Sequence, residues 1–412
     1  MSVLNGMRVV EGSAFVAVPL AGMTLAQMGA EVIRFDRIGG GLDAGRWPLA
    51  PNGQSLFWAG MNKGKKSVVV DMKSPQGREL ISEIITSPGE DSGLFLTNLR
   101  VRGWMDYETL SQAREDLVMV TLTGDRHGRP QVDYTVNPAL GIPMMTGPEG
   151  GSDPVAHALP AWDLIAGNLC VSALLAAERH RLRGHGGQEV EIALKDVAAA
   201  TLGHLGMIGD ATLNGADRAK AGNALYGAYG QDFVCADGRR VMVIGLTHRQ
   251  WRGLVKTLQM GDTIKALEAR LGVSLDDEGN RWAHRKAITA AFEPWFAARR
   301  VDDFARNFNE AGLTWSEFRS VREAMTHDPD VSRENPIFKS VTHPDTGTYL
   351  TPSHPAHFHA LGREAAQPAP VLGAHTEEIL SEVVGLSGRN IGHLFDKGIV
   401  DGPRPNAQKS AA

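Results

Sequence analysis

The chain has 412 residues, a length that predicts two domains rather than a single hydrophobic core. Hydrophobic residues make up 42% of it and charged residues 22%, as in globular proteins, and the net charge of −5 disfavours nucleic acid or an anionic membrane as the main partner. Two cysteines without CxxC spacing support neither a disulfide framework nor a thiolate zinc site, and we expect a reducing, cytoplasmic location.

The first third of the chain alternates between short, β-branched, apolar runs and segments of helical periodicity. This alternation is typical of α/β proteins, in which crossover helices join parallel strands. It predicts an open, doubly wound, Rossmann-like sheet, although the GxGxxG fingerprint of dinucleotide-binding proteins does not follow the first strand. The predicted strands span 7–11, 31–36, 67–72, 93–99 and 117–124, and the predicted helices span 19–29, 75–86 and 107–114.

The rest of the chain completes this large domain and adds a smaller one. A long helix at 163–182 and a strand that follows it extend the large domain over residues 1–220. Two extended runs about Asp237-Gly238 predict a β-hairpin, and amphipathic helices follow it, so we assign residues 225–340 to a smaller α+β domain. Residues 341–412 return to helical periodicity, and we expect this segment to pack back on the large domain.

Charged and polar side chains stand at the ends of several predicted strands, where open α/β sheets bind their ligands. Arg37 follows the second strand, Lys73 the third, and Asn98 and Arg100 the fourth. Together these groups favour a site for one anionic, phosphorylated ligand, whereas each alone is at least as well explained as a solvated loop charge. The cluster also includes three lysines before the third strand, Lys63, Lys65 and Lys66.

Four histidines crowd a short stretch near the C-terminus, namely His343, His354, His357 and His359. No carboxylate or cysteine pattern accompanies them, and two prolines make the stretch loop-like. We therefore expect a surface loop or a strand end here and no metal site.

Asp163 is the acidic residue of the stretch ALPAWDLIAG, residues 158–167, in which its neighbours are apolar or small. One interpretation makes it the N-cap of the long helix, a position at which Asp is preferred. The other makes it a nucleophile, because a desolvated carboxylate attacks more strongly and shields a covalent intermediate from water. The two are compatible, since a helix start can hold the side chain still while a catalytic oxygen faces a cleft.

An ordered set of segments resembles the family III CoA-transferases, the group that includes carnitine, bile-acid and formyl-CoA transferases and the α-methylacyl-CoA racemases. The resemblance covers nearly the whole chain, and its specificity lies in the order of the segments. The segments are MRVVEGSAFVAVPLAGMTLAQMGAEVIRFDR, NKGKKSVVVDMKSPQGRELI, LTNLR, VNPALGIPMMTG, ALPAWDLIAG, AAERHRLRGHGGQEVEIALKDV and PAPVLGAHTEEILSEVVGLS.

The resemblance implies site residues and partners. Asp163 takes the place of the family's catalytic aspartate, and coenzyme A enters as the substrate thioester, with no further cofactor and no metal. The family fold implies an interlocked homodimer, and neither a nucleic acid nor a membrane is expected as a partner. The CoA-binding positions fall on Phe15, Val16, Ala17, Arg37, Val70, Lys73 and Asn98, to which the strand-end position adds Arg100.

Two departures from the family pattern narrow the expected chemistry. The His-Asp pair of the racemases corresponds to Val132-Asp133 here, so the histidine needed for α-proton exchange is absent. The glycine-rich lid of formyl-CoA transferase is not reproduced, which disfavours an oxalate-type substrate, and residues 226–233 stand near its place. Backbone N–H groups near Gly227 and Gly230 are candidates for stabilising oxyanions.

The resemblance is strongest to family members that move CoA between the two carboxylates of one short dicarboxylic acid. It implies an anhydride on Asp163 and then an aspartyl-CoA thioester, with bound CoA supplying proximity. Arg100, Arg102 and His157 are candidates to pair with the distant carboxylate of such a substrate, and each is equally well explained as an ordinary surface or loop residue. The alternatives are an intermolecular CoA transfer to a free acid and, from another class, a non-catalytic CoA-binding protein in which Asp163 is only a cap.

Overall fold

The computed structural model describes residues 2–403. Contacts divide the chain into two compact units. The first unit comprises the described residues up to Leu140, Ala158–Asp210 and the described residues from Pro329 onwards, and the second comprises Gly141–His157 and Ala211–Asp328. The second unit therefore includes residues 141–157 and ends at Asp328, whereas the sequence predicts a smaller domain at 225–340.

The first unit is built on a seven-stranded sheet. Its strands are β1 (Arg8–Gly12), β2 (Glu31–Asp36), β3 (Lys66–Val70), β4 (Leu94–Thr97), β5 (Val118–Thr123), β6 (Gln188–Ala193) and β12 (Val400–Asp401). They are ordered β12-β3-β2-β1-β4-β5-β6, with parallel pairing from β3 to β6 and antiparallel pairing of β12 with β3. Because 3-2-1-4-5-6 is the doubly wound order, the predicted Rossmann-like α/β fold is confirmed.

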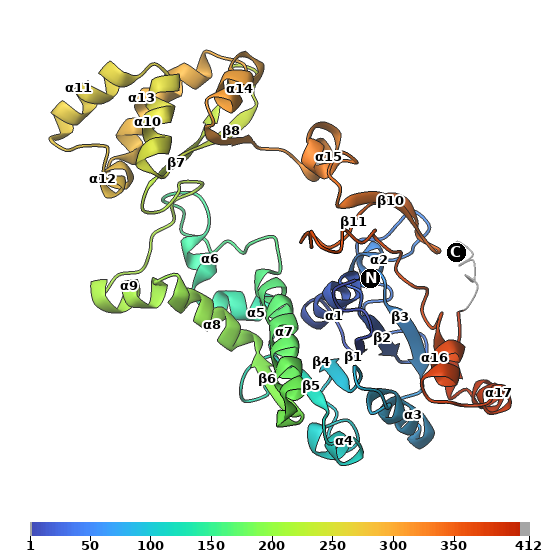
Figure 1. Ribbon diagram of the computed structural model, residues 1–412. Helices are drawn as coiled ribbons and strands as arrows, with labels where there is room; N and C mark the ends of the chain where they lie inside the picture. The colour runs from blue at the N-terminus through green and yellow to red at the C-terminus, as the bar shows by residue number, and fades with distance from the viewer. Residues whose placement is uncertain (1, 404–412) are drawn as a thin grey trace. The chain divides into compact units, whose positions relative to one another are not determined.

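Helices cover both faces of this sheet (Figure 1). On one face α1 (Ala17–Gln27) and α7 (Ala161–His180) pack against each other and over the central strands. The helices of the other face are α3 (Pro75–Ile85), α4 (Tyr107–Ala113), α16 (Thr376–Glu382) and α17 (Gly388–Asp396). Their apolar side chains form one core with residues of β1 to β5. Burial on both faces explains why β3, β4 and β5 are dominated by apolar and β-branched residues.

The C-terminal part of the described chain is tied to the edge strand β3. Val400 of β12 lies opposite Val70, and the backbone N–H of His375 donates to the Ser67 carbonyl at 2.9 Å. Segments more than 300 residues apart in the sequence therefore share one sheet edge. A two-residue strand carries no periodic pattern, so β12 was not predicted.

The first unit holds several shorter elements. They are α2 (Leu56–Met61), α5 (Asp133–Ala139), a π-helical turn at Arg181–His185, α8 (Leu194–His204), a 3-10 turn at Pro329–Val331, and the hairpin of β10 (Phe338–His343) and β11 (Gly347–Pro352). His343 ends β10, as one interpretation of the histidine-rich stretch expected, and it is buried. Its Nδ1 accepts the Ala369 N–H at 3.1 Å. Among residues 2–403, no group of three or more potential ligands is arranged to hold a metal ion.

The second unit is a small α+β assembly with an antiparallel sheet ordered β7-β8-β9. β7 and β8 form the hairpin predicted about Asp237-Gly238, and aromatic residues such as Trp251, Phe292 and Phe308 fill the core beneath it. The elements are α6 (Ile142–Met145), β7 (Tyr229–Val234), β8 (Arg240–Gly245), α10 (His248–Thr257), α11 (Gly261–Leu271), α12 (Glu278–Ala283), α13 (Arg285–Ala297), α14 (Val301–Glu310), β9 (Thr314–Glu317) and α15 (Val321–His327). Helix α9 (Met207–Asn214) crosses the division between the units.

One helical stretch of the described chain, Ala161–His185, is long and apolar enough to cross a membrane by length and composition alone. Most of it is α7, whose side chains from Trp162 to Leu174 include several that are buried in the first unit. Core helices of soluble proteins pass the same test, so this stretch is weak support for a membrane span.

Candidate active site

The chain leaves the neighbouring strands β1 and β4 toward opposite edges of the sheet, which creates a crevice beyond their carboxyl ends. Two hydrogen bonds join the loops that follow these strands. The backbone N–H of Ala14 donates to Asn98 Oδ1 at 2.9 Å, and Asn98 Nδ2 donates to the Ala14 carbonyl at 2.8 Å. Asn98, a predicted CoA-binding residue, thus fixes both loops that border the crevice.

A cavity of about 800 Å³ lies at this point. Loops after β1, β4 and β5, the starts of α5 and α7, and residues between β2 and β3 supply its walls. The structure brings six of the predicted site residues together in this lining: Phe15, Val16, Ala17, Asn98, Arg100 and Asp163. Five charged side chains therefore face one apolar-walled space, the other lining charges being Arg46, Arg129 and Asp133.

Asp163 belongs to the first turn of α7, but it is not the N-cap of that helix. Pro160 occupies the N-cap position and offers no side-chain acceptor. Asp133 of α5 caps the helix instead, since its Oδ2 accepts the backbone N–H of Trp162 at 2.7 Å and that of Asp163 at 3.3 Å. The interpretation of Asp163 as a cap was therefore wrong. The Asp133 carboxylate binds the helix N–H groups, and the Asp163 carboxylate is left to line the cavity.

The surroundings of Asp163 raise its pKa to about 6. Burial is the main cause, because it disfavours the charged form, and the nearby Asp133 carboxylate adds to the shift, while the Arg46 guanidinium opposes it. At neutral pH the carboxylate is ionised but poorly solvated. It is therefore more basic and more nucleophilic than an exposed carboxylate, which is the property that covalent catalysis requires.

Phe15, at the edge of the cavity, holds an unusual backbone conformation. Its φ is +68°, in the left-handed region that non-glycine residues rarely adopt. The buried carboxylate of Asp43 maintains it, because the Phe15 N–H donates to both Asp43 oxygens, at 2.9 and 3.1 Å. Asp43 in turn accepts from Arg34 Nη2 at 3.1 Å. The loop after β1 is thus anchored to a buried charge network.

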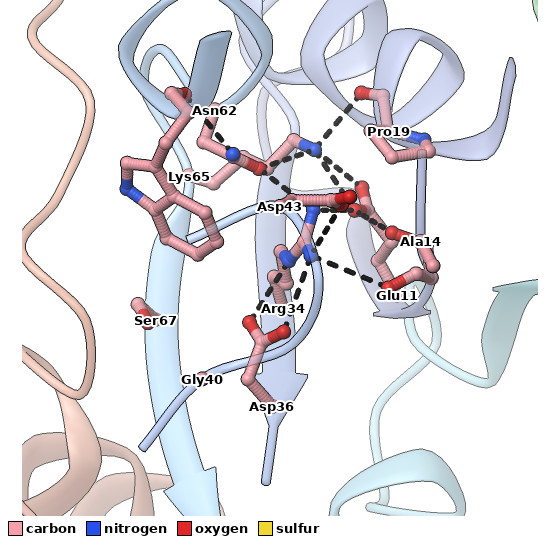
Figure 2. A network of polar contacts seen from close by, with 12 residues as sticks. Glu11, Ala14, Pro19, Arg34, Asp36, Gly40, Asp43, Asn62, Lys65 and Ser67 are labelled. Atoms are coloured by element: carbon pink, nitrogen blue, oxygen red, sulfur yellow. Dashed lines mark hydrogen bonds and ion pairs between the residues drawn. The ribbon is translucent and has the colours of Figure 1, made fainter. Parts of the chain in front are cut away.

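Figure 2 shows this network, in which Arg34 and Lys65 lie among carboxylates beneath the loop. Arg34 donates to Asp36 at 2.9 Å, and Lys65 Nζ lies 2.8 Å from Glu11 Oε2, with all four side chains buried. Burial lowers the pKa of Lys65 to about 8, although Glu11 favours its charged form. With Asp43 included, the network contains three carboxylates and two cations. It holds in place the loops that border the crevice.

The three lysines at or just before the start of β3, namely Lys63, Lys65 and Lys66, do not line the cavity, so their inclusion in the predicted cluster of ligand-binding cations was wrong. Lys65 is enclosed in the buried network, and Lys63 is buried and donates to the Pro352 carbonyl at 3.1 Å. Lys66 pairs with Glu31 and Glu378, both at 2.6 Å. The physical reason is strand direction: these residues lie at the amino end of β3, whereas ligands bind beyond the carboxyl ends.

The predicted CoA-binding residues of β2 and β3 stand apart from the cavity lining. Arg37 is exposed after β2, where its Nε donates to the Gly40 carbonyl at 2.8 Å, and Lys73 is exposed after β3. Val70 is fully buried, and its side chain belongs to the core. Arg37, Val70 and Lys73 lie at the same carboxyl edge of the sheet as the cavity, and their CoA-binding roles stay predictions.

Other predicted residues also stand outside the lining. Arg102 is exposed and does not line the cavity. His157, Gly227 and Gly230 belong to the second unit, and their expected roles stay predictions.

Sequence reasoning missed Asp133 and Arg46 as site residues. The sequence indicated only that Asp133 corresponds to the aspartate of the racemases' His-Asp pair. Its role depends on a helix that starts about thirty residues later. Arg46 lies in an irregular loop, with its carbon Cζ 5.5 Å from the centroid of the Phe15 ring and 5.1 Å from that of Phe57. The available signal was an arginine beside a tryptophan in a glycine-rich loop after a predicted strand.

Comparisons with known proteins agree with this architecture. Among solved structures, a CAIB/BAIF family protein from Brucella suis matches with a TM-score of 0.75 at 22% identity, covering 93% of this chain and 99% of that one, which shows the fold. The chain is 26% identical to the succinyl-CoA:glutarate CoA-transferase of Homo sapiens, across 97% of this chain and 90% of that protein.

A much higher identity is found with a bacterial enzyme. The chain is 54% identical over 402 residues to the 2-methylfumaryl-CoA isomerase of Chloroflexus aurantiacus, which covers 97% of this chain and 98% of that protein. The model of CoA-transferase family III matches residues 4–376. The chain therefore belongs to CoA-transferase family III.

Proposed function

We propose that this protein moves coenzyme A between the C1 and C4 carboxylates of 2-methylfumaryl-CoA, also called mesaconyl-CoA. The observation that carries the proposal is a desolvated carboxylate, Asp163, in the wall of a cavity at the topological switch point. The 54% identity to a 2-methylfumaryl-CoA isomerase supports this substrate.

The proposed reaction begins with attack of an Asp163 oxygen on the thioester carbonyl carbon. The carbon–sulfur bond breaks, giving a mixed anhydride and CoA thiolate, which keeps the electron pair. The thiolate then attacks the Asp163 acyl carbon, giving an aspartyl-CoA thioester and the free dicarboxylate. The same two steps in reverse, with the other carboxylate of the acid as nucleophile, form the isomeric thioester and regenerate Asp163. No net proton or electron transfer is required.

The freed acid has to stay in the cavity and turn before it attacks again. The cavity of about 800 Å³ exceeds the volume of a short dicarboxylate, and its lining includes apolar side chains such as Phe15 and Phe57. Holding the acid, the thiolate and Asp163 together makes each attack effectively unimolecular, which is the main source of rate in such transfers. The backbone N–H groups of Gly227 and Gly230 remain candidates for stabilising the tetrahedral oxyanions.

Coenzyme A would lie along the carboxyl edge of the sheet, from Arg37 and Lys73 to the cavity, with Arg100 at its exposed rim. We further propose a cytoplasmic homodimer of the interlocked kind. Several large apolar side chains of the first unit are exposed on one chain, including Ile165 and Leu169 of α7 and Leu205 after α8, and a partner copy would cover such surfaces. Analytical ultracentrifugation tests this: a dimer is expected, and a monomer at micromolar concentration contradicts it.

Two incubations of the purified protein test the reaction. The first contains mesaconyl-C1-CoA alone, and the second also contains isotope-labelled free mesaconate. Formation of mesaconyl-C4-CoA without label uptake is expected. Uptake of label into the thioester would instead indicate intermolecular CoA transfer, and no turnover would indicate a binding protein. Inactivation by hydroxylamine that requires the acyl-CoA, and that is lost in Asp163→Ser, tests the covalent step.

A further inference from the structure

The cavity lining contains an arginine that has no carboxylate partner in the part of the chain that the structure describes. Arg46 is half-buried in the lining, and within residues 2–403 it forms no ion pair with a carboxylate. The other lining arginines differ from it. Arg129 is already paired with Asp125 at 2.6 Å, and Arg100 is exposed, with its guanidinium in the place that a Cβ on Gly128 would take.

Aromatic rings hold the Arg46 guanidinium in place. Its Cζ lies over the rings of Phe15 and Phe57, with centroids at 5.5 and 5.1 Å, and both rings also line the cavity. The Arg46 carbonyl accepts the Ser55 hydroxyl at 2.6 Å, which fixes the backbone. Contact with a ring occupies a face of the guanidinium, and the in-plane N–H groups stay available to grip a carboxylate with two hydrogen bonds.

Arg46 is close to Asp163 without contacting it. Its charge acts on the Asp163 carboxylate, yet the two groups are farther apart than an ion pair. Both side chains line the same cavity of about 800 Å³, which has room for a short acyl group bound covalently at Asp163 and ionically at Arg46. Without a cation, a second carboxylate in this cavity would be repelled by both Asp133 and Asp163 in poorly solvated surroundings.

We propose that Arg46 binds the carboxylate of the acyl group that is not attached to coenzyme A, and that it thereby selects dicarboxylyl over monocarboxylyl thioesters. This assignment rests on the proposed function. A trans double bond keeps the two carboxyl carbons of mesaconate at one separation, whichever end carries CoA. One arginine at a fixed distance from Asp163 can therefore bind the free carboxylate in both halves of the reaction, first one carboxylate of the acid and then the other.

Binding of two unreactive thioester analogues tests the assignment. In mesaconyl-C1-(dethia)CoA a methylene replaces the sulfur, so that the acyl group is not transferred. Tiglyl-(dethia)CoA has the same skeleton with a methyl group in place of the distal carboxylate. The ratio of their dissociation constants, measured by calorimetry, isolates the distal carboxylate from the CoA portion, which both analogues share.

Wild-type protein is expected to prefer the mesaconyl analogue, and Arg46→Gln to lose about 30- to 100-fold of that preference, as for a lost charged hydrogen-bond pair. Arg46→Lys should keep part of it, and Arg129→Gln, which changes an arginine of the same cavity that is already paired, should keep all of it. Unchanged tiglyl-analogue binding shows that the Arg46 variants are folded. Equal weakening of both analogues in Arg46→Gln, or no preference in wild type, overturns the assignment. The isomerisation assay with wild-type protein reports separately on the proposed function.

Discussion

The carboxylate of Asp133 accepts a 2.7 Å hydrogen bond from the backbone N–H of Trp162, one residue before Asp163. Asp133 therefore acts on the site in two ways. Its carboxylate caps the first turn of α7, which fixes where Asp163 lies, and its negative charge raises the pKa of Asp163. The positioning of the carboxylate and its basicity therefore depend on one residue of α5.

Asp133→Asn is expected to shift the pH dependence of turnover. An amide oxygen still accepts the Trp162 N–H, but the negative charge that raises the pKa of Asp163 is gone. In the proposed mechanism ionised Asp163 is the nucleophile, so kcat/KM should rise with pH through an inflection near 6 in the wild type and through a lower pH in the variant. Profiles measured between pH 4.5 and 8 check the direction of the shift.

Two further variants separate charge from position. Asp133→Ala removes the cap as well, and it should lower stability by about 1–2 kcal/mol. Glu108→Gln, which removes an exposed carboxylate from the first turn of another helix, α4, should leave the inflection where it is. An unshifted inflection in Asp133→Asn would contradict the electrostatic role of Asp133.

The ionised side chain of Asp163 should lower the free energy of unfolding of the protein. Its pKa is raised from an ordinary value of 3.8 to about 6, so the folded state holds its proton more tightly than the unfolded state. The resulting cost applies when the group is ionised in both states, above pH 6, and it disappears below pH 4. Asp163→Asn should therefore be inactive but more stable than wild type at pH 7.5, by up to about 3 kcal/mol.

Denaturant unfolding at several pH values checks this second prediction. The stability gained by Asp163→Asn should shrink as the pH falls through about 6. A variant that is less stable than wild type at pH 7.5 would show that the carboxylate has stabilising partners, contrary to its desolvated position.

Asp43 and Asp36 offer a matched pair for testing the anchor of the loop after β1. Both carboxylates are buried and bind Arg34, at 3.1 and 2.9 Å respectively, but only Asp43 also accepts the Phe15 N–H. Alanine at either position should cost about 2–4 kcal/mol of stability, because each leaves a buried guanidinium with one anion fewer. Only Asp43→Ala should also raise KM for the acyl-CoA, since it releases Phe15 from its left-handed conformation.

Steady-state kinetics at a temperature where both variants are folded checks the difference. Circular dichroism establishes the folded fraction first, so that stability and cavity shape are measured separately. Equal KM values for Asp43→Ala and Asp36→Ala would contradict an anchoring role that is specific to Asp43.

The sheet could be predicted from the sequence because its determinants are local. Strand β2 was located at its observed residues, 31–36, because the β-branched and aromatic residues Val32, Ile33 and Phe35 fall in a short run between a helical segment and a glycine-rich loop. Short connections around crossover helices then imply parallel pairing. By contrast, β12 pairs with β3 across more than 300 residues, and no local pattern encodes such a contact.

Strand direction predicted one part of the cavity lining, and the family resemblance implied Phe15, Val16, Ala17 and Asp163. Asn98 and Arg100 were correctly placed at the carboxyl edge, because residues after parallel strands meet there. Lys65 was misplaced because its neighbour Glu11 is 54 residues away and only the fold brings them together. For the same reason neither Asp133 as the cap of α7 nor Arg46 as a cavity residue could be read from spacing alone.

The contact between α7 and α1 depends on Gly167. A Cβ at this position would lie 2.6 Å from the Ala17 carbonyl oxygen and 3.1 Å from Leu20 Cδ2, so Gly167→Ala has to push the two helices apart. Asp163 lies one turn before Gly167 on α7, and Ala17 lines the cavity. We expect a loss of about 1–3 kcal/mol from overpacking, together with a fall in kcat as Asp163 moves relative to the thioester.

Gly203→Ala on α8 is the control for this substitution. Its Cβ would meet only Ile208 Cδ1, at 3.7 Å, so the alanine is expected to stabilise the helix by about 0.5–1 kcal/mol. Thermal unfolding and kcat of the two variants together distinguish a helix-propensity effect from a packing effect. If Gly167→Ala were as stable and as active as Gly203→Ala, α7 could shift without moving Asp163, and the close approach of the two helices would not set the position of the nucleophile.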